Sequence, residues 1–214
     1  AQEAEERIDD LVKAGASPVG IDVGTSKIVS AKRRGKDMET AGQLNAFIPV
    51  PYSRFTENIL GQNDISYYRE GDELIIFGTP SEKFANMFNA EMRRPMSDGI
   101  LNPKERYAMP VLEAILHTLV PKARVSGDIL AFSVPAAGEG KEADLTYHEA
   151  TLRRFFEGMG YRAVAINEGL SVVFAELESE NFTGIGISCG GGMCNGCLAY
   201  LSIPSILFSI PKGG

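Results

Sequence analysis

The chain has 214 residues, a formal net charge of −7 and a hydrophobic content of 44%, which is ordinary for a globular protein with one or two domains. The acidic balance and the lack of a basic stripe argue against nucleic acid as the main partner. No apolar run approaches the ~20 residues of a membrane-spanning helix, so the sequence predicts no transmembrane segment.

The first residues predict a short helix ahead of the main fold. Ile8, Leu11 and Val12 mark one narrow apolar face, and Gly15 ends the pattern. We expect residues 1–16 to form a surface helix or arm, with contact to a protein partner or a neighbouring subunit as the alternative. No signal-peptide pattern opens the chain, and with only three cysteines this predicts a reducing, cytoplasmic environment.

A strand, a short turn and a second strand follow. Val19–Val23 has the pattern of a buried strand, and Lys27–Arg33 that of its antiparallel partner. Gly24, Thr25 and Ser26 form the turn between them. A plain hairpin turn and a phosphate-binding turn both fit these three residues.

The middle of the chain predicts an inserted subdomain at about residues 48–90, where prolines and glycines interrupt the pattern. Residues 65–77 predict a hairpin, and Ser81–Asn89 a short helix. Pro103–Leu119 is expected to be a helix that Pro110 kinks or divides.

Strands and helices alternate in the later part of the chain, which favours a parallel or mixed α/β sheet. The expected order is strand, helix, strand, helix, over Asp128–Val134, Leu145–Met159, Arg162–Ile166 and Gly169–Glu178. His117 and His148 have no partner motif, and we expect His148 at a helix surface rather than in a site.

A second glycine turn echoes the first one. Gly186–Gly190 is similar to Gly20–Gly24, and each is followed by a turn and two further strands. Three consecutive glycines, Gly190, Gly191 and Gly192, permit positive φ angles and leave the turn without side chains, so their N–H groups can converge on an anion. This is neither a P-loop nor a dinucleotide fingerprint, because a strand rather than a helix follows. If two such turns face each other, the N–H groups of both can bind one polyphosphate.

Four segments resemble motifs of the actin, Hsp70 and sugar-kinase superfamily, and they occur in that family's order. They are Gly20–Lys27, Arg94–Ile100, Val134–Pro135 together with Ile166–Glu168, and Ser188–Asn195. Arg94–Ile100 is most similar to the bacterial actin-like branch of MreB, MamK and FtsA type. The resemblance implies an α/β fold of the actin-like ATPase (RNase H-like) kind. Its first domain would span residues 17–166, and residues 167–214 would begin an incomplete second domain of a longer protein.

The resemblance also implies ATP and Mg²⁺ as cofactors, and self-association into filaments or dimers or a role as a cytoskeletal adaptor. Asp22 would hold the water shell of Mg²⁺. Phosphate contacts would come from both motifs, through Gly24, Thr25, Ser26, Lys27, Ser188, Gly190, Gly191, Gly192 and Met193. Glu168 would orient the water that attacks the γ-phosphate, although helix capping by Asn167 and Glu168 explains the same residues.

The second motif departs from the family pattern. That motif usually begins with Asp and carries Thr after its glycines, where this chain has Ser188 and Met193; Asn195 replaces an acidic residue that often closes it. The glycine turn itself survives, so we expect phosphate binding to persist better than hydrolysis. A scaffold that does not hydrolyse nucleotide is therefore an alternative, as is an Hsp70-like or sugar-kinase-like protein.

The three cysteines offer a different reading. Cys189, Cys194 and Cys197 have the C-x₄-C-x₂-C spacing of plant-type [2Fe–2S] ferredoxins, but the sequence has no fourth cysteine. Three thiolates could hold Zn²⁺ with an outside ligand. Against a metal, Cys194 and Cys197 lie an odd step apart on the predicted strand and so point to opposite faces.

Overall fold

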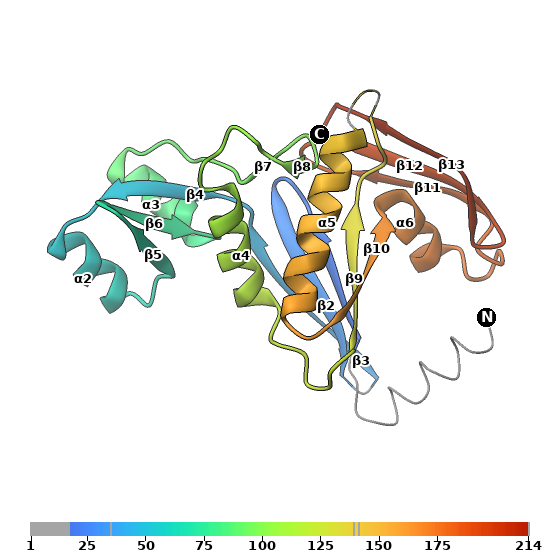
Figure 1. The fold of residues 1–214 in the computed structure, drawn as a ribbon, viewed down its shortest axis with the longest axis horizontal. Helices are drawn as coiled ribbons and strands as arrows, with labels where there is room; N and C mark the ends of the chain where they lie inside the picture. Colours follow the sequence, from blue (N-terminus) through green and yellow to red (C-terminus); the bar gives the residue numbers. More distant parts are fainter. Residues whose placement is uncertain (1–17, 35, 139, 141, 214) are drawn as a thin grey trace.

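The computed structural model describes residues 18–34, 36–138, 140 and 142–213, and the predicted N-terminal helix over residues 1–16 lies outside the described residues. Within this part of the chain, strands and helices alternate in a mixed α/β arrangement (Figure 1). None of the described helices combines the length and apolar character needed to cross a bilayer.

Five strands form the main sheet, in the order β10-β9-β1-β2-β3. Their bounds are β1 (Val19–Val23), β2 (Lys27–Arg34), β3 (Asp37–Leu44), β9 (Ile129–Val134) and β10 (Arg162–Asn167). Strands β1, β9 and β10 are parallel, whereas β2 is antiparallel to both of its neighbours. Parallel strands end at a common edge of a sheet, so the residues after β1, β9 and β10 meet there.

Helices α4 (Ala108–Leu119) and α5 (Glu142–Gly158) lie together over one face of this sheet (Figure 1). Their apolar positions, such as Ile115 and Phe156, pack into the main core with the inward side chains of β1 and β9. The predicted kink at Pro110 is wrong. Helix α4 begins only at Ala108, so Pro110 lies in the first turn, where a missing N–H breaks no hydrogen bond.

His148 of α5 lies in the core, which corrects its predicted surface position. Its side chain is 1% exposed, and its Nδ1 accepts a hydrogen bond of 3.2 Å from the backbone N–H of Leu101. Burial lowers the pKa of His148 to about 4. The imidazole is therefore neutral near pH 7 and fixes the segment before α4.

Residues 47–88 form a small three-stranded sheet, in the order β4-β6-β5, with two helices. Its elements are β4 (Phe47–Pro51), α2 (Arg54–Gln62), β5 (Tyr67–Glu70), β6 (Glu73–Phe77) and α3 (Pro80–Phe88). The hairpin predicted over residues 65–77 is confirmed. Strand β6 is apolar on both faces: Leu74 and Ile76 pack in the small sheet's own core, whereas Ile75 and Phe77 pack in the main core.

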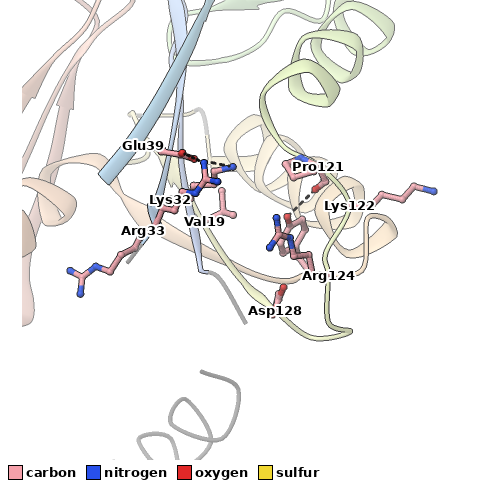
Figure 2. A pocket seen from close by; sticks show the side chains of 10 residues that line it. Val19, Lys32, Arg33, Glu39, Pro121, Lys122, Arg124 and Asp128 are labelled. Carbon is pink, nitrogen blue, oxygen red and sulfur yellow. Dashed lines mark hydrogen bonds and ion pairs between the residues drawn. The ribbon is translucent and has the colours of Figure 1, made fainter. Parts of the chain in front are cut away.

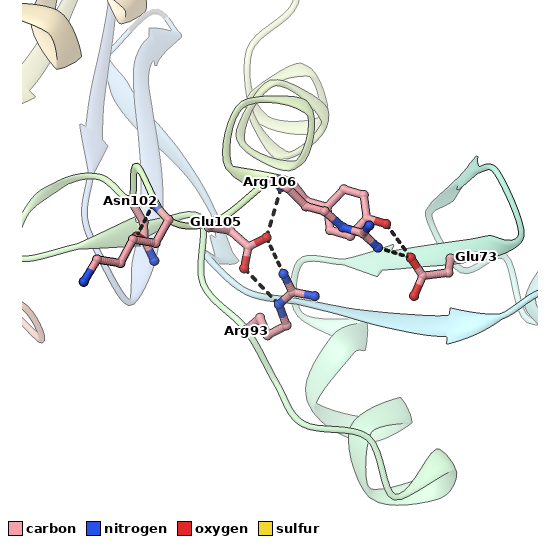
Figure 3. A network of polar contacts seen from close by, with 7 residues as sticks. Glu73, Arg93, Asn102, Glu105 and Arg106 are labelled. Atoms are coloured by element: carbon pink, nitrogen blue, oxygen red, sulfur yellow. Dashed lines mark hydrogen bonds and ion pairs between the residues drawn. The ribbon is translucent and has the colours of Figure 1, made fainter.

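A chain of ion pairs joins this small sheet to the segment that leads into α4 (Figure 3). Arg93 donates two hydrogen bonds, of 2.8 and 2.5 Å, to the carboxylate of Glu105, which also accepts the backbone N–H of Tyr107. The guanidinium of Arg106 and the hydroxyl of Tyr107 both bind one oxygen of Glu73 in β6. The small sheet is thus tied to the segment before α4 by charge, while Ile75 and Phe77 of β6 pack in the main core.

A second three-stranded sheet, β11-β12-β13, packs one face against helix α6. These elements are α6 (Glu168–Glu176), β11 (Gly184–Cys189), β12 (Cys194–Tyr200) and β13 (Ile203–Ile210). The packing is close, because a β-carbon on Gly186 would lie 2.1 Å from the carbonyl oxygen of Gly169. The opposite face exposes apolar side chains: Ile185, Ile187, Leu198, Tyr200, Ile203, Ile206, Phe208 and Ile210.

Candidate functional site

The two glycine turns predicted from the sequence meet at the carboxyl-terminal edge of the main sheet. They border a cavity of about 190 Å³. All the residues predicted for the site line this cavity: Asp22, Gly24, Thr25, Ser26, Lys27, Glu168, Ser188, Gly190, Gly191, Gly192 and Met193. Gly99 and Cys189, which were not predicted for the site, line it as well. Residues separated by more than a hundred positions are therefore neighbours here.

Glycine is required in the second turn because the two turns touch. A β-carbon on Gly191 would lie 2.0 Å from Oγ of Ser26, and one on Gly192 would lie 2.4 Å from Oγ1 of Thr25. The sequence permits positive φ angles at the three consecutive glycines, but none of the three has one. Gly191 and Gly192 leave room for the side chains of Ser26 and Thr25 rather than supplying an unusual backbone conformation.

The carbonyl groups of the first turn, Gly24–Ser26, accept hydrogen bonds from Asn45 and Arg94. The side-chain amide of Asn45 donates to the carbonyl of Gly24 at 2.9 Å, and the backbone N–H of Asn45 donates to that of Ser26 at 3.0 Å. Arg94 Nη1 donates to the carbonyls of Ser26 and Thr25 at 3.2 and 3.4 Å. In a trans peptide the N–H points opposite to the preceding carbonyl, so the N–H groups of Thr25 and Ser26 point away from these partners.

Asp22 is fixed by a neighbouring strand. Ser133, at the end of β9, donates from its hydroxyl to Oδ1 of Asp22 at 2.6 Å and accepts the backbone N–H of Val23 at 3.0 Å. Asp22 itself is exposed at the edge of the cavity. One side chain thus sets the direction of the carboxylate that the sequence predicts for Mg²⁺.

Glu168 lies at the start of α6 and is held by the second turn's strands. Oε2 of Glu168 accepts a 2.8 Å hydrogen bond from the amide of Asn195 and a longer one, at 3.5 Å, from Ser188. Asn195 is fully buried, and its own oxygen accepts the N–H of Ala136 at 3.0 Å. Burial, with the negative charge of Asp22 as a smaller cause, raises the pKa of Glu168 to about 6.

A third segment closes the cavity. The hairpin of β7 (Met96–Ser97) and β8 (Ile100–Leu101) turns at Asp98 and Gly99, which have φ angles of 51° and 75°. The N–H of Gly99 donates to Oγ1 of Thr25 at 3.0 Å. Met193 is 7% exposed, and a β-carbon on Gly99 would lie 2.7 Å from its sulfur. The side chain of Met193 therefore packs the second turn against this hairpin.

Lys27 is placed differently from the turn residues. Its side chain passes over β3, where a β-carbon on Gly42 would lie 2.9 Å from Cε and 3.6 Å from Nζ of Lys27. Lys27 also lines the cavity, and its contact with phosphate stays a prediction.

Sequence reasoning missed three positioning residues: Asn45, Ser133 and the supporting role of Asn195. Ser133 carried a signal, since it is a lone hydroxyl in the apolar strand Ile129–Val134. Asn195 was interpreted as a loss, because an acidic residue often occupies its position. Asn45 had no signal, because its partners depend on the fold of the turn.

The cysteines do not gather around a common point. Cys197 is buried against α6, whereas Cys189 and Cys194 lie on the other face of the sheet, as the spacing predicted. In the described part of the chain, no three His, Cys, Asp or Glu side chains are placed to share a metal ion.

A larger cavity, of about 360 Å³, lies at the opposite end of the main sheet and was not predicted (Figure 2). Charged side chains dominate its lining: Lys32, Arg33, Arg34, Glu39, Lys122, Arg124 and Asp128. Glu39 pairs with Lys32 at 3.3 Å and with Arg34 at 2.7 Å. None of the predicted site residues lies there.

The residues at the glycine turns fit a polyphosphate with Mg²⁺. Both turns present backbone to the cavity, and Asp22 brings a carboxylate, a group that suits the water shell of Mg²⁺. The cavity is smaller than the about 300–1,000 Å³ of pockets that enclose a whole small molecule.

Comparison with solved structures shows the same fold in bacterial filament proteins. A structure described as a MamK double helical filament superposes with a TM-score of 0.61 at 17% identity, over 92% of this chain and 55% of that one. Two structures of MreB5 of Spiroplasma citri, bound to ADP and to AMPPNP, give TM-scores of 0.59 and 0.62 at 14% and 12% identity. Each covers 92% of this chain and 53% of the other, so this chain spans about half the length of the structures it matches.

The predicted actin-like α/β fold is confirmed by these superpositions. A comparison with curated proteins found no match. The model of the Volactin family matches residues 18–214, which is nearly the whole chain. This chain therefore belongs to the Volactin family and has the fold of the bacterial actin-like proteins.

Proposed function

We propose that the cavity binds the phosphates of a nucleoside triphosphate, ATP with Mg²⁺, in an actin-like protein that self-associates. One observation carries the proposal: two turns line one cavity, the second with three consecutive glycines, beside the carboxylates of Asp22 and Glu168. Oriented N–H groups suit the phosphate oxygens, and the two carboxylates suit a cation and a water.

The roles of the residues follow from their positions. The N–H groups of Thr25 and Ser26 and those of Gly191 and Gly192 would bind phosphate, while Asn45 and Arg94 keep the first turn rigid. Bound Mg²⁺ would neutralise charge on the phosphates, with Asp22 holding its water shell. Glu168, kept in place by Asn195, would orient a water near the terminal phosphate.

Self-association is supported by the likeness to MamK, whose structure is described as a double helical filament. ATP is supported by the likeness to MreB5, which binds ADP and AMPPNP. Both likenesses are at the level of the fold.

A scaffold that binds nucleotide without turnover is the second candidate. Ser188 lies 3.5 Å from Glu168, where its hydroxyl can donate a hydrogen bond but supplies no carboxylate for metal or water. The glycine turn beside Ser188 is intact. The residues of this motif would therefore support binding of the nucleotide without supporting its hydrolysis.

Binding is tested with Gly192→Ala and a fluorescent ATP analogue in the presence of Mg²⁺. The new methyl group would push against Thr25, which cannot rotate without losing its bond to Gly99. We expect affinity to fall by at least about tenfold, equivalent to ~1.4 kcal/mol. Gly190→Ala is the matched control, because its β-carbon would meet only the carbonyl of Met193 at 3.7 Å. Equal affinity of the two variants would contradict the proposal.

Assembly and turnover are tested together by sedimenting the full-length protein with and without Mg-ATP while recording phosphate release. Pelleting that requires ATP would support the filament former. We expect slow phosphate release that Ser188→Asp increases, because it adds a carboxylate beside Glu168. ATP binding without pelleting or turnover would favour the scaffold. Equally fast phosphate release by the unmodified protein and by Ser188→Asp would contradict the role given to Ser188.

A further inference from the structure

Two cysteine thiols face each other across the base of the second glycine turn. Cys189 ends β11 and Cys194 begins β12, and the two residues are direct partners in the antiparallel pairing of these strands. Their sulfur atoms lie 2.6 Å apart, and both cysteines are free. The pair flanks the four-residue turn Gly190–Met193.

The backbone register at this position suits a disulfide. The N–H of Gly190 donates to the carbonyl of Met193 at 2.9 Å, so the next pair outward, Cys189 with Cys194, is a non-hydrogen-bonded pair. Residues in such a pair have Cα atoms about 4.5 Å apart and side chains directed toward each other. Disulfides span Cα separations of about 4.4–6.8 Å, so the bond can form with little movement of the backbone.

The two thiols differ in exposure, and the third cysteine is remote from both. Cys189 is exposed and lines the phosphate cavity, whereas Cys194 is half-buried. The hydrogen bond with Cys189, with burial as a smaller cause, raises the pKa of Cys194. Cys197 is fully buried on the other face of the sheet, against Val173 and Ala199.

We propose that Cys189 and Cys194 form a redox modification site that closes to an intrachain disulfide by exchange with a low-molecular-weight disulfide. The thiolate of exposed Cys189 attacks one sulfur of that oxidant, which releases one small thiol and leaves a mixed disulfide. The sulfur of Cys194 then displaces the second small thiol. Two S–H bonds are lost from the protein, and the two electrons and two protons leave with the reduced oxidant.

Oxidation and ligand binding meet at Cys189, which belongs to both the dithiol and the cavity wall. A polyphosphate in the cavity would cover this thiol and slow its reaction. This consequence, unlike the disulfide itself, rests on the proposed function.

The disulfide is tested by incubating the unmodified chain in glutathione buffers of increasing oxidised fraction, then alkylating it under denaturing conditions. We expect a monomer with one alkylated thiol, and peptide mapping that places the bond between Cys189 and Cys194. Reductant should restore all three thiols. Three alkylated thiols in every buffer, covalent dimers as the main product, or a bond that includes Cys197 would overturn the proposal.

Variants of the three cysteines give the matched comparison. Cys197→Ala should still form the disulfide, since Cys197 lies on the other face of the sheet. Cys189→Ser and Cys194→Ser should accumulate at most a mixed disulfide with glutathione. A disulfide in either of these two variants would contradict the assigned pair.

Protection by ligand is measured as the rate at which native Cys189 reacts with N-ethylmaleimide, with and without Mg-ATP. We expect the rate to fall several-fold when ATP is bound. An unchanged rate, in a sample where the fluorescent analogue shows binding, would refute the link between dithiol and cavity. A sample that shows no binding would refute the proposed function and leave the disulfide assignment to the glutathione experiment.

Discussion

His148 shows how one buried titratable group can make the whole chain sensitive to pH. Its Nδ1 accepts the N–H of Leu101, and its Nε2 has no partner among the described residues. The folded protein holds its pKa at about 4, whereas an unfolded histidine titrates near 6.5. The unfolded chain therefore binds a proton at this residue before the folded chain does.

Stability should fall as the pH drops from about 6.5 toward 4, because protonation of His148 favours unfolding in this window. The loss reaches about 3 kcal/mol at its low end, from the difference between about 4 and 6.5. Denaturant unfolding of the chain and of His148→Asn at several pH values measures it, since asparagine keeps an acceptor without titrating there. His117→Gln is the control, and a slope that His148→Asn leaves unchanged would refute the assignment.

At the scale of single residues, the sequence predicted the residues that line the cavity better than the residues that support them. Glu168 and the glycines could be identified because they stand in motifs with local spacing. Asn195 and Ser133 could not, since their roles depend on contacts across 27 and 111 positions of sequence. His148 was misplaced for the same reason: the apolar pattern of α5 does not reveal which polar position faces the sheet.

At the scale of elements, strand patterns gave reliable predictions and helix boundaries did not. The alternation of β1, β2 and β12 identified the strands, while α4 starts five residues later than Pro103 because residues before Ala108 are engaged by ion pairs. The sequence also did not reveal how closely α6 packs against β11. Gly186 in β11 and Gly169 in α6 let the helix lie against the sheet with backbone touching backbone, and this contact sets the position of Glu168.

Gly186→Ala should destabilise the chain, because its new β-carbon would lie 2.1 Å from a backbone oxygen that cannot rotate away. Overpacking of this kind costs about 1–3 kcal/mol. Gly20→Ala in β1 is the matched control, because the atom nearest to its new β-carbon would be 3.9 Å away. Gly20 has no positive φ angle, so alanine fits the backbone there and restricts the unfolded chain. Thermal unfolding of the two variants provides the comparison, and equal melting temperatures would show that α6 can shift freely.

At the scale of the whole molecule, one buried carboxylate couples the start of the small sheet to the segment before α4. Glu105 is 7% exposed and holds Arg93, whose backbone bridges to Phe47 at the start of the small sheet. The neighbouring pair of Arg106 with Glu73 is more exposed. The order of motifs predicted the overall fold, but no sequence pattern indicated that these two pairs join the small sheet to the segment before α4.

Arg93→Ala should cost about 2 kcal/mol, because it leaves Glu105 buried without its partner. It should also loosen the small sheet, which hydrogen exchange of β4 and β6 would detect. Arg34→Ala, which removes an exposed partner of Glu39, should leave the unfolding free energy unchanged. Similar losses of unfolding free energy in Arg93→Ala and Arg34→Ala would argue that the burial of Glu105 does not strengthen its ion pair.

The cavity at the glycine turns also has a consequence for the order of folding. Its wall comes from residues 22, 24–27, 99, 168 and 188–193, so it exists only after segments far apart in the chain have been brought together. Such non-local contacts form late because long loops must close first. A ligand that touches both turns will therefore find no partial site on an unfolded or half-folded chain, and its binding will act as a clamp on the completed fold alone.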